Sequence, residues 1–150
     1  AITSYLRRRY NLIIGERTAE DVKIKIGSAL PLPEELKMEV KGRDWASGLP
    51  RTVEISSAEV TEALQGTLTE IVWAIRGVLE QTPPELASDV IDKGMVLAGG
   101  TSLLRNFDKL LTEATGVPAH LADDPLLCVV KGAGVAVENL DVFRKSITKR

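Results

Sequence analysis

Apolar residues at helical spacing open the chain. In residues 2–13 they recur three to four positions apart, which predicts a first helix that Gly15 ends. A second helix is expected to begin at Thr18, a good N-cap residue with Asp21 at the reciprocal position, and to end at Gly27. The chain therefore starts with two short helices.

Alternating apolar and polar residues follow the second helix. Residues 36–40 and 53–55 have this pattern, which predicts a β-hairpin with a wide loop. Ser56 and Glu59 then have the spacing of a capping box, and one apolar face persists for several turns after them. Prolines at 83 and 84 end this long helix, since proline cannot continue its hydrogen bonds.

The remaining residues alternate between helical and strand patterns. The expected elements are a helix at 85–91, a strand at 95–98, a helix from about 102 to Gly116, a strand at 117–121 and a last helix at 125–137. The last helix is apolar nearly all round, as a helix packed between other elements would be. Together these patterns predict an α/β fold, with a helix-hairpin lobe to about residue 55 and an α/β lobe after it.

Composition narrows the functional classes. The chain has 150 residues, 44% of them hydrophobic and 27% charged, which is ordinary for a globular protein. A net charge of −2 gives no electrostatic footprint for nucleic acid. No apolar run approaches the length that spans a membrane, and the one cysteine suits a reducing cytosol. Because the sequence begins at Ala1 within a helical pattern, we interpret it as part of a longer chain.

Residues 94–105 carry the strongest functional pattern. A buried strand runs into Gly99 and Gly100 and is expected to open a helix. Glycine lets a ligand approach the backbone closely, and a helix N-terminus presents unpaired N–H groups. This arrangement is typical of a nucleotide or anion site at the carboxyl edge of a sheet.

Glu20 and Lys23 lie one turn apart on the second helix, and two interpretations remain open. They can form a surface ion pair worth about 0.3 kcal/mol. Alternatively, the carboxylate accepts from ribose hydroxyls while the lysine stem covers a purine ring. No P-loop or glycine-rich phosphate hairpin accompanies them, so the chain can hold adenosine but has nothing to act on its phosphates.

Other candidates receive structural interpretations. The glycines at 132–134 lack a preceding strand, so close helix packing is favoured over a dinucleotide fingerprint. We interpret residues 92–94 as a turn and the arginines at 7–9 as a solvated face. His120 has no second ligand at metal-binding spacing, and Cys128 is expected to act as a small hydrophobe.

Several co-linear segments together resemble the carboxyl-terminal half of the MreB family of bacterial actin homologues. The resemblance covers essentially the whole chain, and its most specific segments are residues 14–20, 42–44 with 48–50, 82–86, 97–105 and 124–126. It implies half of an actin-like ATPase domain, which is ribonuclease H-like: subdomain IIB at 1–60 and most of subdomain IIA at 61–150.

The resemblance also implies the site. Adenosine contacts are carried over to Glu20, Asp21, Val22 and Lys23 on one side, and to Gly99, Gly100, Thr101, Ser102 and Leu103 on the other. Most relatives have glycine where this chain has Thr101. If that position needs left-handed geometry, nucleotide affinity is weakened; if it is a helix N-cap, threonine is harmless, and we favour the second alternative.

The implied function is the adenosine-binding half of an ATP-dependent filament protein that governs rod cell shape and organises cell-wall synthesis. The alternative is a non-catalytic module that caps or regulates such filaments without binding nucleotide. The family's phosphate loops, catalytic acid and magnesium site belong to the missing half, so this chain alone should not hydrolyse ATP.

The expected partners are other filament subunits, the missing half and a RodZ-like membrane adaptor. The expected location is the cytoplasm, at the inner face of the membrane. The first helix should expose an apolar face where the missing half packs.

Overall fold

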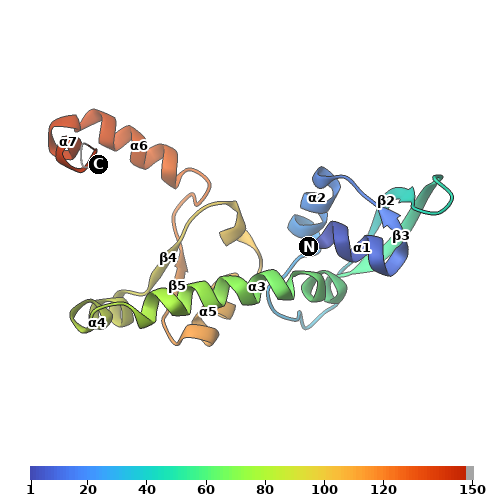
Figure 1. Ribbon diagram of the computed structural model, residues 1–150, viewed down its shortest axis with the longest axis horizontal. Coiled ribbons are helices and arrows are strands. Elements are labelled where there is room, and N and C mark those ends of the chain that lie inside the picture. Colours follow the sequence, from blue (N-terminus) through green and yellow to red (C-terminus); the bar gives the residue numbers. More distant parts are fainter. Residues whose placement is uncertain (148–150) are drawn as a thin grey trace.

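The computed structural model describes residues 1–147. One long helix, α3, links two groups of elements (Figure 1). The first group is α1 (Ile2–Tyr10), β1 (Leu12–Ile13), α2 (Glu16–Ile26), β2 (Lys37–Asp44), β3 (Pro50–Ser56) and the start of α3 (Ser57–Glu80). The second is α4 (Pro84–Lys93), β4 (Met95–Leu97), the 3₁₀ helix η1 (Gly100–Leu103), α5 (Phe107–Thr115), β5 (Ala119–Leu121), α6 (Cys128–Glu138) and α7 (Leu140–Ile147).

The first group is built on an antiparallel sheet in the order β1-β2-β3. Val40 lies opposite Val53 in this sheet, and both side chains are buried, so the predicted hairpin is confirmed; Leu36, predicted to belong to its first strand, precedes β2 and is exposed. Helices α1 and α2 cover the sheet with Leu6 and Val22, which are 1% and 0% exposed. This alternation fixes the register, because a slip by one residue would turn the valines to solvent.

The second group contains a parallel pair, β4 and β5, joined through η1 and α5. Helix α5 buries Phe107 and Leu111. The predicted capping box at the start of α3 is confirmed: the Ser56 hydroxyl accepts from the Glu59 N–H, and the Glu59 carboxylate accepts from the Ser56 N–H. The predicted domain boundary at residue 60 lies within α3 and stays a prediction.

Three predicted helix boundaries are wrong for local reasons. The first helix ends at Tyr10 because Asn11 adopts a left-handed conformation, and Ile13 joins the sheet. The second begins at Glu16 instead of Thr18, since the Gly15 carbonyl accepts from the Ala19 N–H and the helix starts earlier. The helix expected from Ser102 is a 3₁₀ turn followed by α5, because left-handed Asn106 interrupts the helical path.

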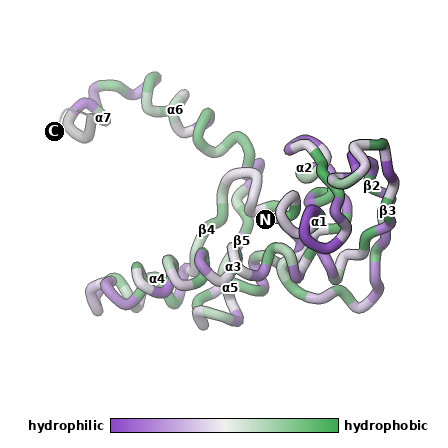
Figure 2. The backbone as a smooth tube through the Cα atoms, turned by 45° about the vertical axis from the view of Figure 1, so that its right-hand side comes forward, coloured by the Kyte–Doolittle hydropathy of each residue, from purple (hydrophilic) through white to green (hydrophobic). Residues whose placement is uncertain are grey.

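The last helix also differs from its prediction. Helix α6 begins at Cys128 instead of Pro125, buries no residue, and continues into α7. It stands apart from the rest of the molecule as an apolar rod (Figure 2). Close packing at Gly132 and Gly134 is absent in the described structure, where a Cβ at either position would meet nothing within 4 Å.

The apolar surface expected on the first helix lies elsewhere. Ile2 and Leu6 of α1 are buried against the first group, so that expectation is wrong. The large exposed apolar side chains gather instead on α6, where Val129 is 80% exposed and Val130 is 68% exposed.

Candidate functional site

Helix α2 carries the first half of the candidate site. The Lys23 ammonium lies 2.8 Å from the Glu20 carboxylate, so the ion pair of the simpler interpretation forms. The Lys23 side chain is only 24% exposed, whereas that of Glu20 is 57% exposed. Between them Asp21 faces solvent and Val22 lies in the core, which leaves Glu20 and Lys23 as the pair on the outer face.

The glycine turn after β4 carries the second half. Gly99 has a φ of 87°, a conformation that glycine adopts without the strain a Cβ would cause. Its N–H donates to the Pro125 carbonyl at 2.8 Å, and its carbonyl accepts from the Ser102 hydroxyl at 2.6 Å. These bonds hold the turn rigidly from both sides.

Thr101 fits this turn without backbone strain. It lies within η1, and its φ is outside the left-handed region. The N-cap position belongs to Gly99, so Thr101 lies two residues further into the helix than we expected. The backbone conformation at this position is nevertheless one that a β-branched residue adopts without strain.

The two halves face each other across a cavity of about 210 Å³. It is lined by Glu20, Lys23, Ile24, Gly100, Leu103, Leu104, Arg105 and Leu126. Glu20 and Lys23 thus meet Gly100 and Leu103, as the paired-site prediction requires. The other five predicted residues (Asp21, Val22, Gly99, Thr101 and Ser102) do not line it. Their predicted role in binding stays a prediction.

Four lining residues were not predicted as part of the site. Ile24 and Leu104 supply apolar wall, and Leu126 approaches the turn so closely that a Cβ on Gly100 would lie 3.3 Å from its terminal methyl. Arg105 adds a positively charged side chain to the lining of the cavity. Ile24 and Leu104 adjoin predicted site residues, and that adjacency could have suggested them; Leu126 comes close only through the Gly99–Pro125 hydrogen bond.

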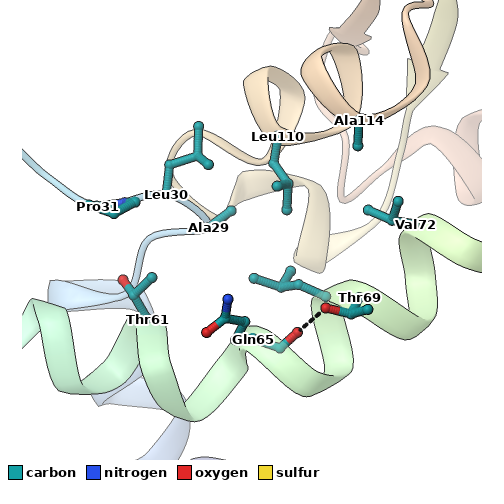
Figure 3. A pocket seen from close by; sticks show the side chains of 10 residues that line it. Ala29, Leu30, Pro31, Thr61, Gln65, Thr69, Val72, Leu110 and Ala114 are labelled. Atoms are coloured by element: carbon teal, nitrogen blue, oxygen red, sulfur yellow. Dashed lines mark hydrogen bonds between the residues drawn. The ribbon is translucent and has the colours of Figure 1, made fainter.

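A second cavity, of about 330 Å³, lies between α3 and α5 (Figure 3). Val72, Leu110 and Ala114 make its wall largely apolar. Two of its hydroxyls already have partners: Thr61 donates to the Ser28 carbonyl at 3.1 Å and Thr69 to the Gln65 carbonyl at 2.8 Å. No charged side chain lines this cavity, so it has fewer groups that could bind a polar ligand than the smaller cavity has.

Two tyrosines with raised pKa values lie where α1 meets α3, away from the candidate site. Burial and a hydrogen bond to Glu62 raise the pKa of Tyr5 to about 12. A short hydrogen bond to Glu59 also raises the pKa of Tyr10. Within residues 1–147 no group of three or more potential metal ligands occurs, and no helix is long and apolar enough to cross a membrane.

Comparison with known proteins finds relatives that are named as cell shape-determining proteins. The family model described as MreB/Mbl protein matches residues 1–145. The chain is 54% identical over 142 residues to the cell shape-determining protein MreB of Escherichia coli, covering 95% of this chain and 41% of that protein. It is 46% identical over 144 residues to Mbl of Bacillus subtilis, covering 96% and 43%. The chain therefore spans less than half the length of these relatives.

Solved structures agree with this assignment. MreB5 of Spiroplasma citri bound to ADP superposes with a TM-score of 0.87 at 37% identity, over 99% of this chain and 44% of that one. The same protein bound to AMPPNP gives a TM-score of 0.88 at 38% identity, over 97% and 44%. The MamK double helical filament shares the fold alone, at 20% identity and a TM-score of 0.72 over 92% of this chain and 42% of that one. The predicted α/β, actin-like fold class is confirmed.

Proposed function

Because the chain belongs to the MreB/Mbl family, we propose that it forms the adenosine-binding half of an ATP-dependent, actin-like filament protein that determines cell shape. One observation carries this proposal. Glu20 and Lys23 of α2 face Gly100 and Leu103 across a single cavity, although the two segments are far apart in the sequence.

The cavity suits a base and its ribose. The Glu20 carboxylate can accept hydrogen bonds from two ribose hydroxyls, and charged acceptors make the stronger bonds of this kind. The half-buried Lys23 stem can lie along one face of a purine while its ammonium stays near solvent. Leu103 and Leu126 offer apolar contact, and Gly100 leaves room for the ring beside the backbone.

The size of the cavity limits what it holds. At about 210 Å³ it is smaller than the ~300–1,000 Å³ typical of pockets that enclose a whole ligand. We therefore assign it the adenosine moiety, with phosphates and magnesium held by other parts of the protein. The nucleotide-bound structures of MreB5 support a nucleotide as the ligand.

The remaining parts of the proposal rest on the family. Residues 1–60 correspond to subdomain IIB and residues 61–150 to most of subdomain IIA. The full protein is proposed to polymerise head to tail, an interface type that generates open filaments. It is also proposed to lie at the inner face of the membrane, held by a RodZ-like adaptor.

The site is tested by calorimetric titration of ATP into the full-length protein and two variants. Lys23→Ala removes the cover over the base, and Gly100→Val fills the space beside the turn. Each should weaken binding about tenfold or more, a loss of about 1.4 kcal/mol, because the first variant removes the aliphatic stem that covers the base and the second obstructs the base.

Matched controls separate the site from general damage. Lys93→Ala breaks a comparable ion pair, with Asp89 on α4, and Gly77→Val changes a glycine with no neighbour within 4 Å. Both should bind ATP like the parent protein, as should Arg8→Ala. Equal affinity for all variants refutes the site. If the parent protein binds no nucleotide, the chain is instead a module that caps or regulates filaments.

A further inference from the structure

We propose that Arg105 is a positioning residue that holds α2 against the glycine turn and so sets the spacing between Glu20 and Gly100. The inference rests on the proposed function, because it concerns how the two halves of that same site are kept opposite each other. Arg105 is one residue beyond the η1 C-cap, Leu104, and its side chain reaches back to α2.

The Arg105 side chain caps the end of α2. Its Nη1 donates to the Lys25 carbonyl at 2.8 Å and to the Gly27 carbonyl at 3.4 Å. The last carbonyls of a helix lack partners within the helix, and the negative end of the helix dipole favours a cation there. Since Lys23 lies in the last turn of α2 and Glu20 one turn earlier, movement of this end displaces both residues.

The backbone of Arg105 makes a second connection to the same segment. Its carbonyl accepts from the Ala29 N–H at 2.8 Å and from the Ser28 hydroxyl at 3.3 Å. Ser28 is fully buried, and its hydroxyl also accepts from the Asn106 amide at 3.1 Å. A buried hydroxyl with several partners tolerates little displacement, because a shift would weaken several hydrogen bonds at once.

In this arrangement the Arg105 side chain adds hydrogen bonds to a junction that the backbone bonds already fix. The backbone bonds set where the two segments meet. The guanidinium then determines how the last turn of α2 is oriented over that junction. Because Arg105 also lines the cavity, direct contact with the nucleotide is the competing role that an experiment must separate.

Two nucleotides distinguish the roles in the full-length protein. ATP carries the ribose hydroxyls that Glu20 is proposed to bind, and 2′,3′-dideoxy-ATP lacks them. Arg105→Gln should weaken ATP binding about tenfold, a loss of roughly 1.4 kcal/mol, while weakening dideoxy-ATP much less, so that the preference for ATP shrinks. Arg105→Lys keeps a cationic donor and should restore part of that preference.

A matched control and a double variant complete the test. Arg76 donates from Nε to the Ala114 carbonyl at 2.8 Å, near the end of α5, so Arg76→Gln removes a similar helix-end contact away from the site and should change neither affinity. In a Glu20→Gln background, Arg105→Gln should cause little further loss of the ATP preference, since contacts that act as one unit are not additive.

Hydrogen exchange tests the positioning independently of any ligand. Arg105→Gln should speed exchange of the Gly27 and Ala29 amides, and Arg76→Gln should not. Unchanged exchange overturns the positioning role, and an equal loss of affinity for both nucleotides together with unchanged exchange assigns Arg105 a direct contact with the nucleotide instead. A parent protein without a preference for ATP contradicts the proposed ribose contact of Glu20 instead, and the exchange result then still decides whether Arg105 orients α2.

Discussion

The amino-terminal region, residues 1–56, and the C-terminal arm, residues 128–147, use apolar residues in opposite ways. In the first, Val40 is 1% exposed within the sheet and Leu12 is fully buried. In the second, Val129 is 80% exposed and Leu140 is 53% exposed. Both segments are rich in apolar residues, but only the first encloses them within the described structure.

The difference shows that the pattern of apolar residues in a segment depends on what packs around that segment in the whole protein. A hairpin with alternating residues needs one covered face, and α1 and α2 supply that cover nearby in the sequence. A helix that is apolar all round needs neighbours on several sides. The relatives are more than twice as long as this chain, so in them more chain is available to surround such a helix.

The largest contrast is expected from matched leucine truncations. Leu12→Ala should lower the free energy of unfolding by about 2–5 kcal/mol, because it leaves a cavity in a closed core. Leu140→Ala in the arm should change it by no more than about 0.5 kcal/mol, as exposed positions do. Urea denaturation of the 150-residue chain measures both. A comparable loss from Leu140→Ala would show that the arm is packed.

Alanine substitution at two glycines should change stability in opposite directions. A Cβ on Gly27 would overlap the Lys23 carbonyl oxygen, so Gly27→Ala should destabilise the chain by about 1–3 kcal/mol. Gly132→Ala meets nothing within 4 Å in α6 and should stabilise that helix by about 0.5–1 kcal/mol. Thermal unfolding followed by circular dichroism reads the two shifts. Destabilisation by Gly132→Ala would place a neighbour beside α6.

The exposed valines of the arm should cause the 150-residue chain to associate. Replacing Val129 and Val137 with lysine should shift its sedimentation toward the monomer, because a contiguous apolar patch favours association. Lysine at Thr67 and Gln81, which are exposed on and just after α3, adds the same charge without removing the patch. Should this control disperse the chain equally well, charge and not the arm governs association.

The last expected effect is a pH dependence that arises where Tyr5 of the amino-terminal region contacts Glu62 of α3. Folding raises the pKa of Tyr5 from about 10 to about 12, so it stabilises the neutral phenol. That stability is complete below pH 10 and is lost as the pH rises toward 12. Tyr5→Phe should therefore flatten the fall in unfolding free energy over this interval. An equally steep fall in the variant, measured by urea denaturation, would assign the alkaline loss to other groups.

Local sequence was sufficient wherever the structure depends on near neighbours. The Ser56–Glu59 capping box, the hairpin and the end of α3 before Pro83 are of this kind. The start of α2 could not be predicted from Thr18, because a glycine carbonyl can begin a helix without a side-chain cap. The left-handed Asn106 that delays α5 likewise leaves little trace in an apolar pattern.

The candidate site likewise has residues that the sequence could predict and residues that it could not. The glycine turn was visible as a motif, whereas the spacing of Glu20 and Lys23 alone favours an ordinary surface ion pair, and only the family resemblance joined them to the turn. Arg105 and Leu126 owe their positions to hydrogen bonds between distant segments. Such contacts exist only once the chain is folded.

The central claim is that α2 and the glycine turn clamp adenosine between them. A crystal structure of the full-length protein with AMPPNP tests it most directly. We expect a ribose hydroxyl within hydrogen-bond distance of the Glu20 carboxylate, and the base between the Lys23 stem and the Gly100–Leu103 turn. A nucleotide bound elsewhere, with the Glu20–Lys23 ion pair intact and untouched, would contradict the account.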